Sequence, residues 1–336
     1  MRPTLHPRLL NGRAGDPGVL VEALHAPGAV LFDCGDLSAL STGLLLRIDL
    51  LCVSHAHMDH WSDFDRLLRP LIGREKVLQV VGPPGFAAQL RHRLASYTWN
   101  LVDRIATELR IEATEVHADA LHRTQFRLQT GFAPEAERTE ARGDVVLELG
   151  PLRLRAALLD HGTPSLGFAL EEALHLNVWR TKLEERGLPT GPWLATLKEA
   201  VAQGLPDDHP VPVFVRPRDE AAAPVQPLGE LRDLVGVTKG QRVAYLTDFG
   251  DTPGNRQAAI ALAREADLLF IEAPFLAADA GIAADRMHLT TAAAGAIARV
   301  AGARRVEPFH LSPRYTGREA EWLAEIEAAF GRPLSP

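Results

Sequence analysis

Cysteine and lysine are both scarce in this chain of 336 residues. The two cysteines, Cys34 and Cys52, lie inside apolar runs, which argues against a disulfide framework and favours reduced thiols in a cytoplasmic protein. Only four of the 36 basic residues are lysines, and the formal net charge is −7 at pH 7. The chain therefore lacks the overall basic field typical of nucleic-acid-binding proteins, and any contact with RNA must be local.

Long apolar runs are missing as well. No segment approaches the roughly 18 uninterrupted apolar residues of a membrane span. The N-terminal stretch "MRPTLHPRLLNG" contains no apolar region of the kind found in signal peptides. We therefore expect a soluble globular protein that neither spans a membrane nor is exported. A hydrophobic share of 46% is ample for the core of one large domain or two ordinary ones.

Short apolar, β-branched runs recur along both halves of the chain and predict strands. These runs lie at 18–24, 29–35, 50–55, 77–83, 144–150, 153–162, 242–248, 268–274 and 304–311. Helical patterns occupy 85–96, 255–266 and 289–302. In the last of these, Thr290 or Thr291 is expected to cap the helix and Gly302 to end it. The alternation of strand and helix predicts the α/β class, with helices covering the faces of a sheet.

One segment, 173–235, interrupts this alternation. It contains two helix-forming stretches around the break "GLPTGP", followed by "PDDHPVPVFVRPRDEAAAPVQP", which is rich in proline and has no periodicity. We interpret this segment as an inserted arm that separates 1–172 from 236–336. Long loops are either functional or disordered, so the alternative is a surface loop without a function.

The stretch "SHAHMDHWSD", residues 54–63, follows the apolar run "IDLLCV" and carries three histidines and two aspartates. On an extended segment, His55 and His57 face the same side, so both can reach one ion. Asp59 and His60 follow directly and can turn toward a second ion. Histidines this dense at the end of a buried strand need a partner that satisfies several imidazoles, and a divalent metal does so.

Three further candidate ligands, His161, Asp248 and His310, each end an apolar run. Open α/β sheets gather functional groups at the carboxyl ends of their strands, so these side chains are expected to meet. Imidazole and carboxylate without thiolate suit zinc, with manganese or iron as alternatives. A single histidine such as His161, His288 or His310 is more often structural than a ligand. The spacing in "HAHMDH" is what favours metal.

These motifs resemble the metallo-β-lactamase superfamily, and residues 29–316 as a whole resemble its ribonuclease Z branch. The "HxHxDH" pattern is specific to the superfamily. The other stretches that carry the resemblance are "LFDCGD" (31–36), "VVGPPGF" (80–86), "DHGTPSLGF" (160–168), "AYLTDFGDT" (244–252), "MHLTTAAAGAIA" (287–298), "HLSPRY" (310–315) and "ERGLPTGPWLATLK" (185–198). The last of these resembles the stem of the arm with which this branch grips tRNA.

The resemblance implies a metallo-β-lactamase fold, an αββα four-layer sandwich with an inserted arm. It implies two Zn²⁺ ions per chain, with Mn²⁺ or Fe²⁺ as alternatives, in a cytoplasmic enzyme that we expect to be a homodimer. Its implied activity is endonucleolytic hydrolysis at the 3′ end of precursor tRNA by a metal-bound hydroxide.

The resemblance also implies a role for each site residue. One ion would be held by His55, His57 and His161, the other by Asp59, His60 and His310, with Asp248 bridging. Asp59 would orient the hydroxide, and His288, paired with Glu272, would protonate the leaving oxygen. From their chemistry, Ser312 and Arg314 are expected to contact a phosphate.

Two features keep other readings open. The continuation "HMDHWSDFDRLLRP" differs from the family's pattern, and methionine between the ligands is typical of relatives that hydrolyse small phosphodiesters. The expected arm carries few bases: Arg180, Lys182, Arg186 and Lys198, interspersed with acids. The second reading is therefore a hydrolase of a cyclic phosphate or nucleotide diester, or less favourably of a lactone or thioester. A third, a non-catalytic binding module, is disfavoured because all seven ligands are present.

Overall fold

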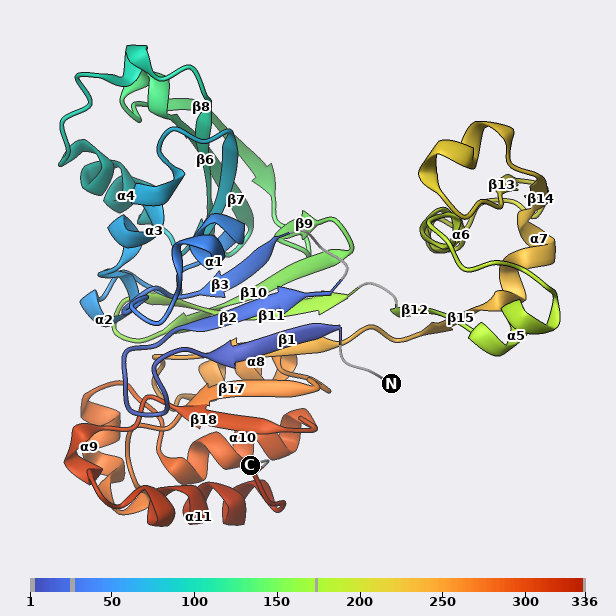
Figure 1. Cartoon of the computed structure of the whole chain (residues 1–336). Helices are drawn as coiled ribbons and strands as arrows, with labels where there is room; N and C mark the ends of the chain where they lie inside the picture. The colour runs from blue at the N-terminus through green and yellow to red at the C-terminus, as the bar shows by residue number, and fades with distance from the viewer. Residues whose placement is uncertain (1–3, 25–27, 173–174, 335–336) are drawn as a thin grey trace. The chain divides into compact units, whose positions relative to one another are not determined.

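The computed structural model of the chain describes residues 4–24, 28–172 and 175–334 (Figure 1). The chain divides into two compact units. The larger consists of Met1–Glu171 with Gln241–Pro336, and the smaller is Glu172–Gly240. The segment that we interpreted as an arm, 173–235, falls within the smaller unit.

The first sheet of the larger unit runs in sequence order, with eight strands among the described residues. Its strands are β1 (Leu5–Leu9), β2 (Val19–Ala23), β3 (Ala29–Phe32), β4 (Ile48–Cys52), β5 (Lys76–Gly82), β6 (Leu109–Val116), β7 (Ala120–Arg127) and β8 (Pro134–Ala141). Strands β3 to β6 are mutually parallel, and the outer pairs are antiparallel. The connections between the parallel strands contain helices α1 (Thr42–Arg47), α2 (Met58–Trp61), α3 (Phe64–Leu71) and α4 (Phe86–Ala95).

The second sheet has the order β18-β17-β16-β11-β10-β9. Its strands are β9 (Leu147–Leu149), β10 (Leu152–Asp160), β11 (Pro164–Glu172), β16 (Arg242–Leu246), β17 (Leu268–Glu272) and β18 (Val306–Phe309). Strands β16, β17 and β18 are parallel. Helices α8 (Pro253–Leu262), α9 (Ala280–Asp285), α10 (Thr291–Ala301) and α11 (Glu319–Phe330) belong to this half.

Three hydrophobic clusters define the layers. One packs α3 and α4 on the first sheet, through residues such as Phe64 and Phe86. A second lies between the two sheets and contains Phe32 and Phe168, whose ring centroids are 5.8 Å apart. The third packs α8, α10 and α11 on the second sheet, with α10 and α11 outside β17 and β18 in Figure 1. This arrangement is an αββα four-layer sandwich, as predicted.

The predicted strands and helices are present, with ends shifted by a few residues. Thr290 caps α10 by accepting from Ala293 N, and Gly302 ends it at φ 70°. Five strands of the two sheets, β1, β6, β7, β8 and β11, were not predicted. In the part of the chain that the structure describes, none of the helices is long and apolar enough to span a membrane.

The smaller unit has a hydrophobic core of its own. Strand β12 (His175–Val178) pairs with β15 (Val235–Thr238), and β13 (Pro210–Pro212) pairs with β14 (Val225–Pro227). Helices α5 (Arg180–Glu185), α6 (Trp193–Ala202) and α7 (Leu228–Leu231) complete the unit. Trp193 and Val211 are fully buried in its core. The proline-rich stretch that lacked periodicity thus contributes core residues, because proline blocks regular structure there without preventing burial.

Candidate metal centre

Each predicted ligand lies just beyond the carboxyl end of a strand, on two sheets that face each other. His55 follows β4 in the first sheet, whereas His161, Asp248 and His310 follow β10, β16 and β18 in the second. The four strand ends meet at one edge of the sandwich. Open α/β folds gather functional groups at this edge.

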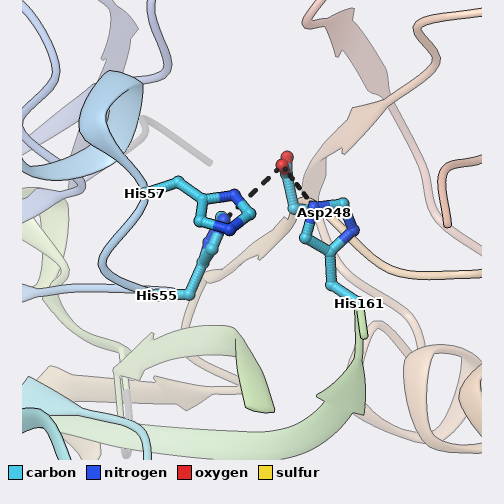
Figure 2. Close-up of side chains that lie close together, drawn as sticks. All are labelled: His55, His57, His161 and Asp248. Atoms are coloured by element: carbon cyan, nitrogen blue, oxygen red, sulfur yellow. Dashed lines mark ion pairs between the residues drawn. The ribbon is translucent and has the colours of Figure 1, made fainter. Parts of the chain in front are cut away.

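The first group consists of His55, His57, His161 and Asp248 (Figure 2). One donor atom from each lies within 4.8 Å of the others. The Asp248 carboxylate oxygen Oδ2 is 3.4 Å from His161 Nε2 and 3.7 Å from His55 Nε2. His161 is oriented by its Nδ1, which is 2.8 Å from the carbonyl oxygen of Met287.

The second group consists of Asp59, His60 and His310. Asp59 and His60 lie on the single-turn helix α2. Asp59 Oδ2 is 3.5 Å from Nε2 of both His60 and His310. The other oxygen of Asp248, Oδ1, is 3.1 Å from His310 Nδ1 and 3.5 Å from His60 Nε2. Asp248 therefore faces the histidines of the first group with Oδ2 and those of the second group with Oδ1.

Burial and charge divide the histidines of the centre into two kinds. Burial lowers the pKa of His55 to about 2, so its imidazole is neutral and free to act as a ligand. Burial also opposes the charged form of His60, but the carboxylates of Asp248 and Asp33 outweigh it and raise the pKa of His60 to about 10. Burial likewise opposes the charged form of His310, but the carboxylates of Asp248, Asp59 and Glu272 outweigh it and raise the pKa of His310 well above its usual value. Metal binding would displace these protons.

The donor atoms fit a metal ion. Among the described residues, Nε2 of His55 and Nε2 of His60 are buried without a hydrogen-bond partner, an unfavourable arrangement unless another group satisfies them. Two donors bound tetrahedrally at roughly 2.1 Å lie roughly 3.4 Å apart. The separations from Asp248 to the four surrounding imidazole nitrogens, 3.1–3.7 Å, are close to this value. Fold and donor set together indicate a metal cofactor.

The backbone is strained at the same place. Asp33, Asp248 and His310 have φ values of 54°, 47° and 64°, in the left-handed region that residues with a side chain rarely adopt. Such conformations cluster at functional sites, where the surrounding structure holds them. At Asp248 and His310 the turn comes directly after a strand and directs the side chain into the centre.

Asp33 is a residue of the centre that we did not predict. It is fully buried, and its Oδ2 lies 2.8 Å from His60 Nδ1 while accepting hydrogen bonds from Ser54 Oγ and Tyr245 OH at 2.8 and 2.7 Å. Its Oδ1 accepts from Ser54 N at 2.7 Å. Asp33 thereby fixes the ring of His60 and leaves Nε2 directed at the centre. A carboxylate ending the apolar run "AVLFD" was the available signal.

Replacing Asp33 by asparagine is expected to weaken metal binding by roughly 10- to 100-fold, as for other groups that orient a ligand. The two carboxylate oxygens of Asp33 serve several donors, whereas an asparagine amide has only one acceptor oxygen. The variant should therefore also lose about 1–3 kcal/mol of unfolding free energy. Titration with zinc against a chelator and urea unfolding measure the two effects. Tyr245→Phe, which removes one donor only, serves as the control and should leave metal affinity nearly unchanged.

His288 and Glu272 lie beside the two groups. Glu272 is fully buried, and its Oε1 accepts from the backbone N–H groups of Phe249 and Leu289. Its Oε2 is 2.8 Å from His288 Nδ1 and 3.4 Å from His310 Nδ1. Burial lowers the pKa of His288, but the Glu272 carboxylate outweighs it and raises the pKa above its ordinary value.

A cleft of about 280 Å³ opens onto this side of the centre. Asp59, His288 and His310 line it, together with Ser312 and Arg286. The contact of Ser312 with a phosphate stays a prediction. Arg314 is exposed and is not among the residues that line the cleft. Arg286, which the sequence did not single out, is the arginine that lines this space.

Solved structures with a similar fold include the metallo-β-lactamase fold protein YhfI from Bacillus subtilis. It shares 17% identity, with a TM-score of 0.57 and coverage of 98% of this chain and 95% of that one. The short form of human tRNase Z shares 17% identity, with a TM-score of 0.52 and coverage of 92% and 93%. The chain therefore has the metallo-β-lactamase fold, which confirms the predicted class.

Curated relatives narrow the class further, although no family model matches the chain. Ribonuclease Z from Deinococcus radiodurans is 34% identical over 305 residues, which cover 89% of this chain and 86% of that protein. Ribonuclease Z from Geobacillus kaustophilus is 31% identical over 322 residues, with coverage of 93% and 88%. The chain belongs to the ribonuclease Z family.

Proposed function

We propose that this protein is a metal-dependent endoribonuclease that hydrolyses precursor tRNA at its 3′ end. The observation that carries the proposal is the convergence of six ligand-type side chains around Asp248 in a chain of the ribonuclease Z family. Incubation of the metal-loaded protein with precursor tRNA and analysis of the product ends test it. A protein that holds metal and leaves precursor tRNA uncut would contradict the proposal.

Two metal ions per chain fit the arrangement best, and zinc suits its donors. His55, His57 and His161 would hold one ion, Asp59, His60 and His310 the other, and Asp248 would bridge them. Such a pair supplies a water nucleophile that is deprotonated near neutral pH and positive charge for the phosphoryl oxygens. Elemental analysis of protein purified without chelator should give about two equivalents more than Asp248→Ala retains, with manganese and iron as the alternative metals.

The chain's own residues would position the reacting groups and move the protons. Asp59, between His60 and His310, would accept a hydrogen bond from the attacking water and orient it. His288 has its Nδ1 directed at Glu272, so Nε2 is the atom free to hold a proton for the leaving 3′ oxygen. Arg286 and Ser312 line the cleft and would contact the phosphate or its flanking nucleotide. The role expected of Arg314 stays a prediction.

Hydrolysis of a small phosphodiester is the second candidate function, and two observations favour it. Met58, between His57 and Asp59, is 82% exposed beside the centre, a position suited to contact with a small apolar group. In the smaller unit, Arg180 pairs with Glu184, while Lys182 and Arg186 both pair with Asp233. Bases neutralised in this way release few counterions from RNA, so they would add little affinity.

Replacing residues 173–235 with a short Gly-Ser linker is expected to distinguish the two substrates. Strands β12 and β15 pair antiparallel, with His175 opposite Thr238 and Val178 opposite Val235, so the chain enters and leaves the smaller unit on neighbouring strands and a short linker can join them. Cleavage of precursor tRNA should fall through a higher KM, because contacts remote from the scissile bond contribute binding energy. Hydrolysis of bis(p-nitrophenyl) phosphate by the same variant is the internal control and should be nearly unchanged. Equal losses on both substrates would mean that the segment supports the catalytic unit itself.

Location and assembly complete the proposal. Cys34 and Cys52 are both buried and unpaired, which supports a reducing, cytoplasmic environment. The homodimer expected from the family resemblance stays a prediction, and sedimentation equilibrium of the full chain tests it.

A further inference from the structure

A second cluster of metal-ligand side chains lies apart from the centre described above. Glu115, His117 and His122 come from the end of β6 and the start of β7, and one donor atom from each lies within 4.8 Å of the other two. None of the three belongs to the seven-residue centre. Strand β5 separates β6 from β4, so the two sites stand on strands roughly 10 Å apart.

Strand geometry places all three side chains on one face of the sheet. Glu115 is directly opposite His122 in the β6–β7 register, and His117 follows Glu115 by two residues. The face is the one covered by helices, because Ile111 and Ala113 on the same face belong to the cluster that packs α4. The intervening residue Val116 points into the core between the sheets.

The contacts hold the cluster in place. Glu115 Oε1 accepts from Ala87 N in the first turn of α4 at 2.8 Å, which leaves Oε2 directed at His117 Nε2, 3.0 Å away. Arg142 donates to the carbonyl oxygen of His117 and fixes its backbone. The rings of His117 and His122 are 4.0 Å apart between centroids. Within the described residues we find no hydrogen bond to either ring nitrogen of His122.

We propose that Glu115, His117 and His122 form a further divalent-metal site, for which zinc is the best match. One carboxylate with two imidazoles is a donor set that zinc proteins use, with a fourth position open to water. The 3.0 Å between Glu115 Oε2 and His117 Nε2 is near the roughly 3.4 Å expected between donors on one ion. Glu115 is buried, whereas 27% of the His117 side chain is exposed, so an ion can enter from solvent.

A metal at this site would have a structural role. It would link the turn between β6 and β7 to the first turn of α4 through Glu115, which contacts both. Binding to the folded chain alone would raise the unfolding temperature with free zinc concentration. The proposal does not depend on the proposed activity, because the donors of the two sites are separate.

The experiment is a zinc titration of the metal-free full chain against a chromophoric chelator, with thermal unfolding at each zinc concentration. His122→Ala should bind one equivalent less than the unaltered chain and lose part of the zinc-dependent rise in unfolding temperature. His92→Ala, an exposed histidine on α4 outside every cluster, is the matched control and should titrate as the unaltered chain does. Asp248→Asn should lose ions of the main centre and retain this one.

Glu115→Gln provides a second variant should His122→Ala fail to fold. Its amide oxygen still accepts from Ala87 N, but the side chain has lost the charge that favours a cation. It should also lose one equivalent. Stoichiometry in His122→Ala or in folded Glu115→Gln equal to that of the unaltered chain would overturn the proposal and leave a hydrogen-bonded Glu115–His117 pair. Because each site is removed by its own variant, failure here is distinguishable from failure of the main centre.

Discussion

Asp248→Ala is expected to lose both ions of the proposed centre and, with them, hydrolysis of every phosphodiester substrate. Asp248 is the residue whose two carboxylate oxygens face both ligand groups, with four imidazole nitrogens 3.1–3.7 Å away. Removal of a group that binds the metal directly should exceed the roughly 100-fold loss seen for groups that orient a ligand. Elemental analysis and turnover of the same preparation measure the effect.

Two companion variants separate metal binding from folding. Asp248 has φ 47°, where asparagine is tolerated better than alanine, so Asp248→Asn removes the charge with little added strain. It should unfold like the unaltered chain when both are free of metal. Asp251→Ala alters an exposed aspartate of the same loop that pairs with Arg256, and it should keep metal and activity. An Asp248→Asn protein that keeps as many tightly bound ions as the unaltered chain, with full turnover, would refute the bridging role.

His288→Ala is expected to keep both ions and lower turnover by roughly 10²- to 10⁴-fold, the usual loss on removing a general acid. The effect should be largest for RNA, whose leaving ribose oxygen needs a proton. It should be small for bis(p-nitrophenyl) phosphate, because p-nitrophenolate leaves without one. Comparing the two substrates at saturating concentration, beside elemental analysis, measures both effects.

The contacts of His288 suggest a second variant, Glu272→Gln, to be compared with His288→Ala. Glu272 lies 2.8 Å from His288 Nδ1 and also 3.4 Å from His310, and His288 could therefore belong to a ligand group with Asp248 and His310. Glu272→Gln retains an acceptor for the N–H groups of Phe249 and Leu289 but no longer stabilises a charged imidazole. It should reproduce part of the His288→Ala loss on RNA. Loss of an ion in His288→Ala would identify His288 as a ligand, and equal rates on both esters would make it structural.

The loop at 55–60 could be predicted as a metal-binding loop because its ligand-type residues are close together in the sequence. His55, His57, Asp59 and His60 fall within six residues after one buried strand, so neither pairing nor packing is needed to bring them together. The caps of α10 were readable for the same reason, since a helix end depends on its own few residues. The other ligands were found as strand-ending residues, but their mutual distances came only from the sandwich.

Strand β8 could not be predicted from the pattern of apolar residues. Its stretch "PEAERTEA" is exposed at almost every position, so no apolar alternation marks it, and it is a strand because it pairs with β7. Helix α11 differs, because Trp322, Ile326 and Phe330 are buried at a spacing of four residues. That periodicity was present in the sequence, but our sequence analysis did not predict a helix there.

By itself, the sequence determined the α/β class, the identity and order of the ligand-type residues, and the loop that brings four of them together. Only the tertiary structure decided that Asp248 faces two ligand groups, that Asp33, which accepts a hydrogen bond from Tyr245, orients His60, and that Arg286 rather than Arg314 lines the cleft. The physical reason is the separation, along the sequence, of the residues that make each contact. Periodicity, capping and motif spacing reflect contacts between residues a few positions apart, whereas Asp33 and Tyr245 are 212 positions apart and meet only when two sheets pack face to face.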